Sequence, residues 1–207
     1  MDFTTSSAFA SLSWVEHGFG TRHHTSTPSG LATLKQIHSN LVLVAESPGP
    51  CGEGDALVTN RPGLAVSVRT ADCYPIFLAD ARNRAVAAIH AGWRGTAAHI
   101  VQITLEKMKT EFGTSPADVH AAIGPGIGVC CYEIGEEVAR QFGFECRTHL
   151  DLAFENRKQL EAAGVAPQNI EALGVCTFCD AERFFSYRRE KEKAGRMTSF
   201  VRVIKPR

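Results

Sequence analysis

Residues 69–95 read RTADCYPIFLADARNRAVAAIHAGWRG, and this stretch decides the expected fold. It contains two apolar runs of strand length, Pro75–Ala79 and Ala85–His90. Apolar runs this short are typical of buried β-strands. Two glycines follow the second run, and apolar residues then recur at helical spacing over Thr96–Phe112. The pattern predicts two buried strands, a tight turn and an amphipathic helix.

Further short strands and helices are predicted on both sides of this centre. Gln36–Ala45 and Val119–Ile123 are expected to be strands. Gly135–Phe142 and Asp151–Ala163 are expected to be helices, the second with Asp151 as its N-cap. Short strands so close in sequence favour mixed or antiparallel pairing over a regular βαβ series. Residues 1–207 are therefore expected to form one α/β domain.

The composition is that of an ordinary globular protein. Its 22 basic residues balance 22 acidic residues, for a formal net charge of zero. Proteins that bind nucleic acid through electrostatics normally carry a basic excess, so no nucleic-acid partner is expected. No apolar stretch approaches the length of a membrane span, and the N-terminus lacks the features of a signal peptide. We expect a cytoplasmic protein with no membrane partner, in which the seven cysteines are free thiols or metal ligands.

Two histidines and one cysteine offer three ligands of the kind that zinc prefers. Cys73 lies 17 residues before His90 and 35 residues after His38. Three protein ligands leave the fourth tetrahedral position open, which is the pattern of catalytic zinc. The spacing forms no compact motif, and each residue is also compatible with a structural role. A metal-free alternative uses Cys73 as a nucleophile and His90 as the base that converts it to a thiolate.

Several residues are candidates to bind an anionic or aromatic substrate. A strand–turn–helix junction places His90 beside the first N–H groups of a helix, which attract anions. Arg94 adds charge to that turn, and Arg188 lies in the run FFSYRR. Arg22 in HGFGTR and Tyr132 in YEIGEEV complete the set of candidate substrate contacts. A solvated face is the alternative interpretation of the arginines.

The remaining cysteines lie in two short motifs. Cys130 and Cys131 end the glycine-rich run GPGIGVCC, which lacks the GK[ST] of a phosphate-binding loop. Cys176 and Cys179 form a CxxC, which is typical of a redox pair, half of a zinc site or a coincidence. Because adjacent cysteines suit a four-cysteine site poorly, we interpret all four as structural or incidental.

Seven motifs resemble those of the YfiH-like family, in order, between about residues 17 and 203. They are HGFGTR, QIHS, GDALVT, TADCYP, HAGWRG, IGPGIGVCCYEIGEEV and FFSYRRE…GRM. The resemblance implies an α-β-β-α sandwich of mixed sheets, likened to cysteine hydrolases, in which His38, Cys73 and His90 bind zinc. It also implies phosphorolysis of adenosine, inosine and methylthioadenosine, and deamination of adenosine. Members are also described as copper-dependent polyphenol oxidases (laccases) and as a cytoplasmic amidase that edits peptidoglycan precursors.

This chain departs from the family pattern just after Arg22. Members usually have R-x-G-G-x-S where this chain has RHHTS, and a longer segment where it has TSTPSGLATLK. We therefore expect one wall of the family's substrate pocket to be shorter in this chain.

The implied activities differ in how well the residues support them. A multicopper centre needs many imidazoles, usually as His-x-His pairs, whereas this chain has 8 histidines and no His-x-His. A single Cu²⁺ in the His₂Cys site is the copper alternative that remains. The H-x-E…P-C-x-x-C deaminase signature is absent as well. In this family context, the ordered set of His38, Cys73 and His90 implies a zinc enzyme, monomeric or a small homo-oligomer, that acts on a purine nucleoside and phosphate.

Overall fold

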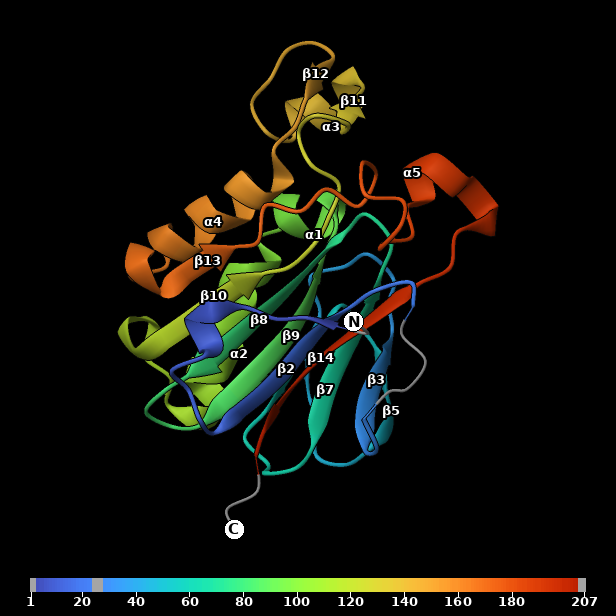
Figure 1. Ribbon diagram of the computed structural model, residues 1–207. Helices are drawn as coiled ribbons and strands as arrows, with labels where there is room; N and C mark the ends of the chain where they lie inside the picture. Colours follow the sequence, from blue (N-terminus) through green and yellow to red (C-terminus); the bar gives the residue numbers. More distant parts are fainter. Residues whose placement is uncertain (1–2, 24–27, 205–207) are drawn as a thin grey trace.

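Two six-stranded mixed sheets pack face to face in the computed structural model, which describes residues 3–23 and 28–204 (Figure 1). The first sheet has, in spatial order, β1 (Phe3–Thr4), β2 (Val15–Gly20), β14 (Met197–Val203), β7 (Ala65–Thr70), β3 (Leu31–Lys35) and β5 (Gly49–Glu53). The second has β13 (Ile170–Ala172), β10 (Val119–Ile123), β8 (Tyr74–Asp80), β9 (Ala85–Ala91), β6 (Ala56–Thr59) and β4 (Val42–Val44). A small ribbon pairs β11 (Glu133–Ile134) with β12 (Thr148–His149).

Helices cover the outer face of the second sheet. They are α1 (Trp93–Ala97), α2 (Ile100–Phe112) and α4 (Leu152–Ala162), and they lie on one side of the sandwich in Figure 1. The apolar stripe of α2, which includes Ile100, Leu105 and Met108, is buried against strands of that sheet. Two further short helices, α3 (Glu136–Arg140) and α5 (Tyr187–Glu190), lie above the ends of the sheets.

The inner faces of the two sheets form a second core. Phe19 from β2 stacks on Phe77 from β8, with ring centroids 4.4 Å apart and an interplanar angle of 7°. Both rings are fully buried. Because Phe19 and Phe77 belong to different sheets, their contact helps to fix how one sheet sits on the other.

Three connections cross from the first sheet to the second at one end of the sandwich. They join β3 to β4, β5 to β6, and β7 to β8. A chain that crosses from one sheet to the other must turn sharply. Side chains in that turn are not packed on the face of either sheet, so they can point toward a site. These crossovers carry His38, Asp55 and Cys73. Their clustering at one end creates the place where a site can form.

The predicted α/β sandwich of mixed sheets is confirmed, with differences in detail. The expected strand over Gln36–Ala45 is wrong in its first half, because residues 36–41 form a loop and only Val42–Val44 is a strand. The helix expected from Thr96 is interrupted at His99, whose φ of 61° is left-handed, so that α1 and α2 are separate. The N-cap role of Asp151 is confirmed, since its carboxylate accepts a hydrogen bond from the Phe154 amide at 2.9 Å.

Two expectations stay as predictions: that residues 1–207 form one domain, and that the sandwich is like that of cysteine hydrolases. His24, Thr25 and Ser26 of the divergent segment after Arg22 lie outside the described residues. Within the described residues, no helix is long and apolar enough to cross a membrane.

Phe19→Ala should lower the free energy of unfolding by about 3–5 kcal/mol, because it removes a buried ring that bridges the sheets. The matched control is Phe154→Ala on α4, where the ring is 55% exposed and the change should stay below about 1 kcal/mol. Urea denaturation of both variants measures the difference. Equal losses for the two variants would contradict the bridging role of Phe19.

Candidate active site

His38, Cys73 and His90 meet at the end of the sandwich where the crossovers gather. His38 lies in the loop between β3 and β4, Cys73 precedes β8, and His90 is the penultimate residue of β9. Their ligand atoms all lie within 4.8 Å of one another. His90 is buried, Cys73 is half-buried and His38 is exposed, so the cluster has one side toward solvent. The three residues that the sequence could not connect are therefore neighbours in space.

A buried carboxylate, Asp55, organises this cluster. Its Oδ1 lies 2.8 Å from Nδ1 of His90, and its carboxylate accepts hydrogen bonds from the backbone amides of residues 37, 38 and 39. The Ser39 hydroxyl donates a further bond at 2.7 Å. One side chain therefore fixes both the His90 ring and the loop that carries His38. Sequence analysis missed this residue, although it lies in the GDALVT motif.

The charges in the cluster depend on one another. Burial alone would raise the pKa of Asp55, but hydrogen bonds from His90 and Ser39 lower it to about 2. Burial alone would lower the pKa of His90, but the bonds to Asp55 and Cys73 raise it to about 9. Burial opposes ionisation of Cys73, but hydrogen bonds from His38 and His90 lower its pKa to about 6. Cys73 is therefore a thiolate at neutral pH.

This donor set fits a divalent metal such as zinc. Because ionised Asp55 can only accept, Nδ1 of His90 carries a proton and its Nε2 is left to face the cluster. A thiolate and two imidazoles at these separations match bonds of ~2.0 Å from zinc to nitrogen and ~2.3 Å from zinc to sulfur. His38, Cys73 and His90 would be the ligands, and Asp55 would orient one of them.

The backbone around the cluster is held in unusual conformations. His38 and Asp72 have φ values of 59° and 86°, in the region that side-chain-bearing residues rarely adopt. Gly92 in HAGWRG is needed for a different reason, because a Cβ there would lie 2.9 Å from Sγ of Cys73. The backbone strain of a positive φ, as at His38 and Asp72, is tolerated where surrounding contacts impose it, and such strain concentrates at functional sites.

A second buried carboxylate, Asp72, ties the opposite wall to the cluster. It accepts hydrogen bonds from the Thr177 hydroxyl at 2.7 Å, the Ser186 hydroxyl at 3.1 Å and the Arg188 amide at 2.7 Å. Its carbonyl accepts from the Ile127 amide at 2.8 Å. Asp72 immediately precedes Cys73, so residues 105 to 116 positions after Asp72 are fixed beside the thiolate.

The cluster opens into a cavity of about 1020 Å³. Five basic side chains line it, Lys35, Arg69, Arg188, Lys191 and Arg196, against the acidic side chains of Asp72 and Glu192. Even with the Cys73 thiolate counted as a third negative group, basic side chains are in excess, so the lining is electropositive. Such a cavity favours an anionic group such as phosphate.

The four candidate substrate contacts lie in two different places. Tyr132 and Arg188 line the cavity, and the guanidinium stacks over the Tyr132 ring at 5.4 Å while it donates to the Glu133 carbonyl. Arg22 is instead paired with the Ala181 carbonyl and stacked over Phe185, outside the cavity lining. Arg94 stacks over Trp93 at 4.3 Å and is also outside the lining.

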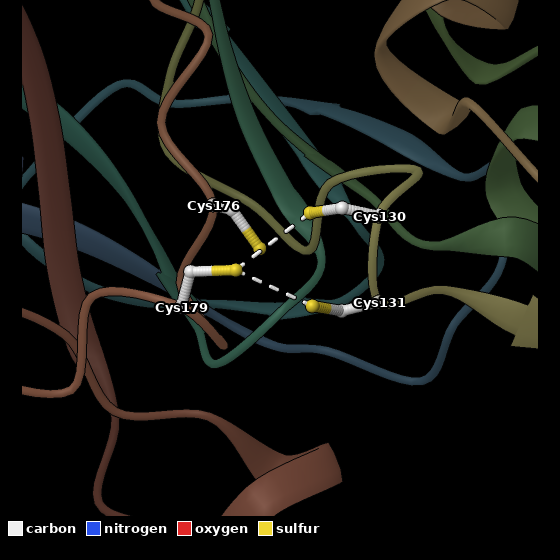
Figure 2. A group of neighbouring side chains, drawn as sticks. All are labelled: Cys130, Cys131, Cys176 and Cys179. Carbon is white, nitrogen blue, oxygen red and sulfur yellow. Dashed lines mark hydrogen bonds between the residues drawn. The ribbon is translucent and has the colours of Figure 1, made fainter.

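The structure corrects the expectation for the other cysteines. The thiols of Cys130, Cys131, Cys176 and Cys179 all lie within 4.8 Å of one another (Figure 2). Adjacent cysteines were expected to suit a four-cysteine site poorly, yet both thiols contact Cys179 from the same turn. The turn around Cys130, with amides 131 and 132 both bonded to the Gly128 carbonyl, directs the neighbouring side chains to one place.

Residues 20–204 match the family described as multi-copper polyphenol oxidoreductase laccase. The chain belongs to this family. A relative named purine nucleoside phosphorylase, from Deinococcus radiodurans, is 45% identical over 181 residues, which cover 82% of this chain and 69% of the relative. Adenosine deaminase RL5, from an unknown prokaryotic organism, is 39% identical over 69% of this chain and 59% of its own length. The crystal structure of Bacillus licheniformis YfiH superposes with a TM-score of 0.84 at 26% identity, covering 91% of this chain and 92% of that one.

The laccase-family resemblance inferred from the motifs is thus confirmed. Relatives in the family are named for different activities, so family membership alone does not select a reaction.

Asp55→Asn should weaken zinc binding by about 10–100-fold, because the amide cannot hold the His90 ring and the His38 loop as the carboxylate does. Competition with a chromogenic chelator measures the affinity. Asp80→Asn is the matched control, since Asp80 is equally buried but caps the turn after β8. Unchanged affinity in the Asp55 variant would show that this carboxylate does not position the ligands.

Proposed function

We propose that this chain is a zinc enzyme that cleaves purine nucleosides by phosphorolysis, with the ion held by His38, Cys73 and His90. The observation that carries the proposal is a three-donor cluster at the base of an electropositive cavity. Relatives named purine nucleoside phosphorylase support the substrate class. Deamination of adenosine at the same centre is a second candidate reaction on the same class of substrate, but it is a hydrolysis at the purine ring and not a transfer of the sugar; it is in keeping with the relative named adenosine deaminase.

The reaction sets clear requirements for the site. A phosphate oxygen forms a bond to C1′ of the sugar as the bond from C1′ to the purine nitrogen breaks. The bonding electrons leave with the purine, which must gain a proton or a strong hydrogen bond. Zinc, when bound, supplies a Lewis acid that polarises a coordinated oxygen and lowers the pKa of bound water. The remaining requirements fall to side chains that hold phosphate and stabilise the leaving base.

Arg69 and Arg188 are the proposed phosphate contacts. Both line the cavity, and a guanidinium presents a planar set of N–H donors that matches phosphate oxygens. Arg188 is held in place by its two bonds of 3.0 Å to the Glu133 carbonyl and by its stack on Tyr132. Because this anchoring is made before substrate arrives, little side-chain entropy is lost on binding.

Tyr132 is the proposed hydrogen-bond donor to the leaving purine. Burial and the negative charge of Cys73 raise the pKa of Tyr132 to about 12. The phenol therefore keeps its proton at neutral pH and can donate it toward developing negative charge. Its ring also offers an aromatic surface for a flat base.

A second candidate function follows from the chain Asp55–His90–Cys73. A carboxylate that orients an imidazole beside a thiolate is the arrangement of a cysteine hydrolase. It supports the amidase alternative, in which Cys73 would attack a carbonyl without a metal. His38 separates the two proposals, because a triad has no need of a second imidazole against the thiolate, whereas a three-ligand metal site requires it. A copper ion in the same three-ligand site is the corresponding oxidase alternative.

His38→Ala and Cys73→Ala should each lower kcat/KM for inosine with phosphate by more than about 100-fold, because loss of a ligand costs more than loss of a group that orients one. The chain's zinc content should fall with activity in both variants. His149→Ala, an exposed histidine on β12, is the control and should leave both unchanged.

Three outcomes separate the alternatives. Full nucleoside turnover by a folded Cys73→Ala chain would refute the site. Hydrolysis of a UDP-muramyl peptide that needs Cys73 but survives both His38→Ala and chelation would establish the amidase instead. Phenol oxidation that follows copper content would favour the oxidase.

A further inference from the structure

Four cysteines from two distant loops form a second cluster, separate from the proposed active site. Cys130 and Cys131 lie between β10 and β11, and Cys176 and Cys179 follow β13. Figure 2 shows the four thiols pointing toward a common centre. None is in a disulfide, and Sγ of Cys179 lies 3.7 Å from that of Cys130 and 3.4 Å from that of Cys131. We propose that these four thiolates bind a structural zinc ion.

The separations agree with tetrahedral coordination. Four sulfurs at ~2.3 Å from a zinc ion lie about 3.8 Å from one another. The two contacts of Cys179 are close to this value, and all four sulfurs lie within 4.8 Å. Four thiols packed this closely repel one another once ionised, so the arrangement is stable as a set of thiolates only around a cation. A tetrahedral set of four sulfurs selects zinc or iron over harder ions.

The backbone around the cluster also suits a metal–thiolate centre. The Gly128 amide donates to Sγ of Cys176 at 3.2 Å, a bond that stabilises negative charge on the sulfur. A Cβ at Gly128 would lie 3.2 Å from Cβ of Cys176 and 3.3 Å from Sγ of Cys130, so glycine lets the two loops approach. An isolated parallel bridge between Gly126 and Cys176 fixes their register.

The two loops that the ion would join both build the proposed active site. The first carries Ile127 and Tyr132 of the cavity lining, the latter directly after Cys131. The second carries Thr177, directly after Cys176, whose hydroxyl donates to Asp72. Apart from the bridge and a few hydrogen bonds, these loops have no regular structure to hold them. Four coordinate bonds would therefore act as a cross-link that closes one wall of the cavity, with no open position for chemistry.

Metal content tests the proposal independently of any activity. Cys73→Ser removes the thiolate from the His38–Cys73–His90 site, so zinc that this chain retains belongs to the four-cysteine cluster. We expect that chain to keep one zinc ion after gel filtration, and the same chain with Cys131→Ser and Cys179→Ser added to keep none. Adding Cys51→Ser and Cys146→Ser instead is the matched control and should keep the ion. A folded Cys73→Ser chain without zinc, or with iron in its place, would overturn the proposal.

Chemical modification of cysteines in the unaltered chain tests the same proposal if the variants fail to fold. Iodoacetamide should modify Cys146, which is exposed, at the same rate with and without a zinc chelator. Cys130 and Cys179 are also exposed, yet they should be protected until the chelator is added. Equal modification under both conditions, or a disulfide within the cluster, would refute zinc binding. Both experiments keep their meaning if nucleoside phosphorolysis fails, because neither reads out turnover.

Discussion

The buried carboxylate of Asp55 is the contact on which the proposed active site depends. It accepts from three consecutive amides of the His38 loop and from the His90 imidazole, while its own backbone amide and carbonyl bond Leu41 and His90. A buried charge without partners would cost several kcal/mol, so this arrangement is maintained only if every partner is present. The crossover between β5 and β6 therefore holds together two candidate ligands, His38 from the connection between β3 and β4 and His90 from strand β9.

Asp72 has the corresponding function on the other side of Cys73. Its left-handed backbone turns the chain sharply between the two sheets, and its carboxylate binds Thr177, Ser186 and the Arg188 amide. The thiolate thus lies between one carboxylate that fixes the imidazoles and another that fixes the cavity wall. Loops on both sides of Cys73 are thus tied to a buried carboxylate whose charge must be satisfied by hydrogen bonds.

Sequence patterns predicted most of the fold and the identity of the three candidate ligands, but not the contacts between them. The apolar runs at β8, β9 and β10 and the stripe of α2 are local periodicities, so they could be recognised directly. The sequence pattern predicts a strand at His38, because no local signal shows that the amides of residues 37–39 donate to Asp55. In the sequence, Asp55 resembles any turn residue, because its burial depends on the tertiary fold. The four-cysteine cluster was not expected, because Cys130 and Cys131 are adjacent in sequence; the turn around Cys130 nevertheless brings both thiols to Cys179.

The two cysteine-containing clusters differ in the number of coordination positions that they would leave open on a bound ion. This difference bears on the laccase description of the family. In the described part of the chain, imidazoles join only one group of three or more potential metal ligands, which is His38, Cys73 and His90. The four-cysteine group has no imidazole, and its four donors would satisfy a tetrahedral ion completely. A multicopper centre needs several histidine-bound ions near one another. The ligand supply therefore supports one mononuclear centre with an open position facing the cavity, and a second, closed centre that holds the wall of that cavity in place.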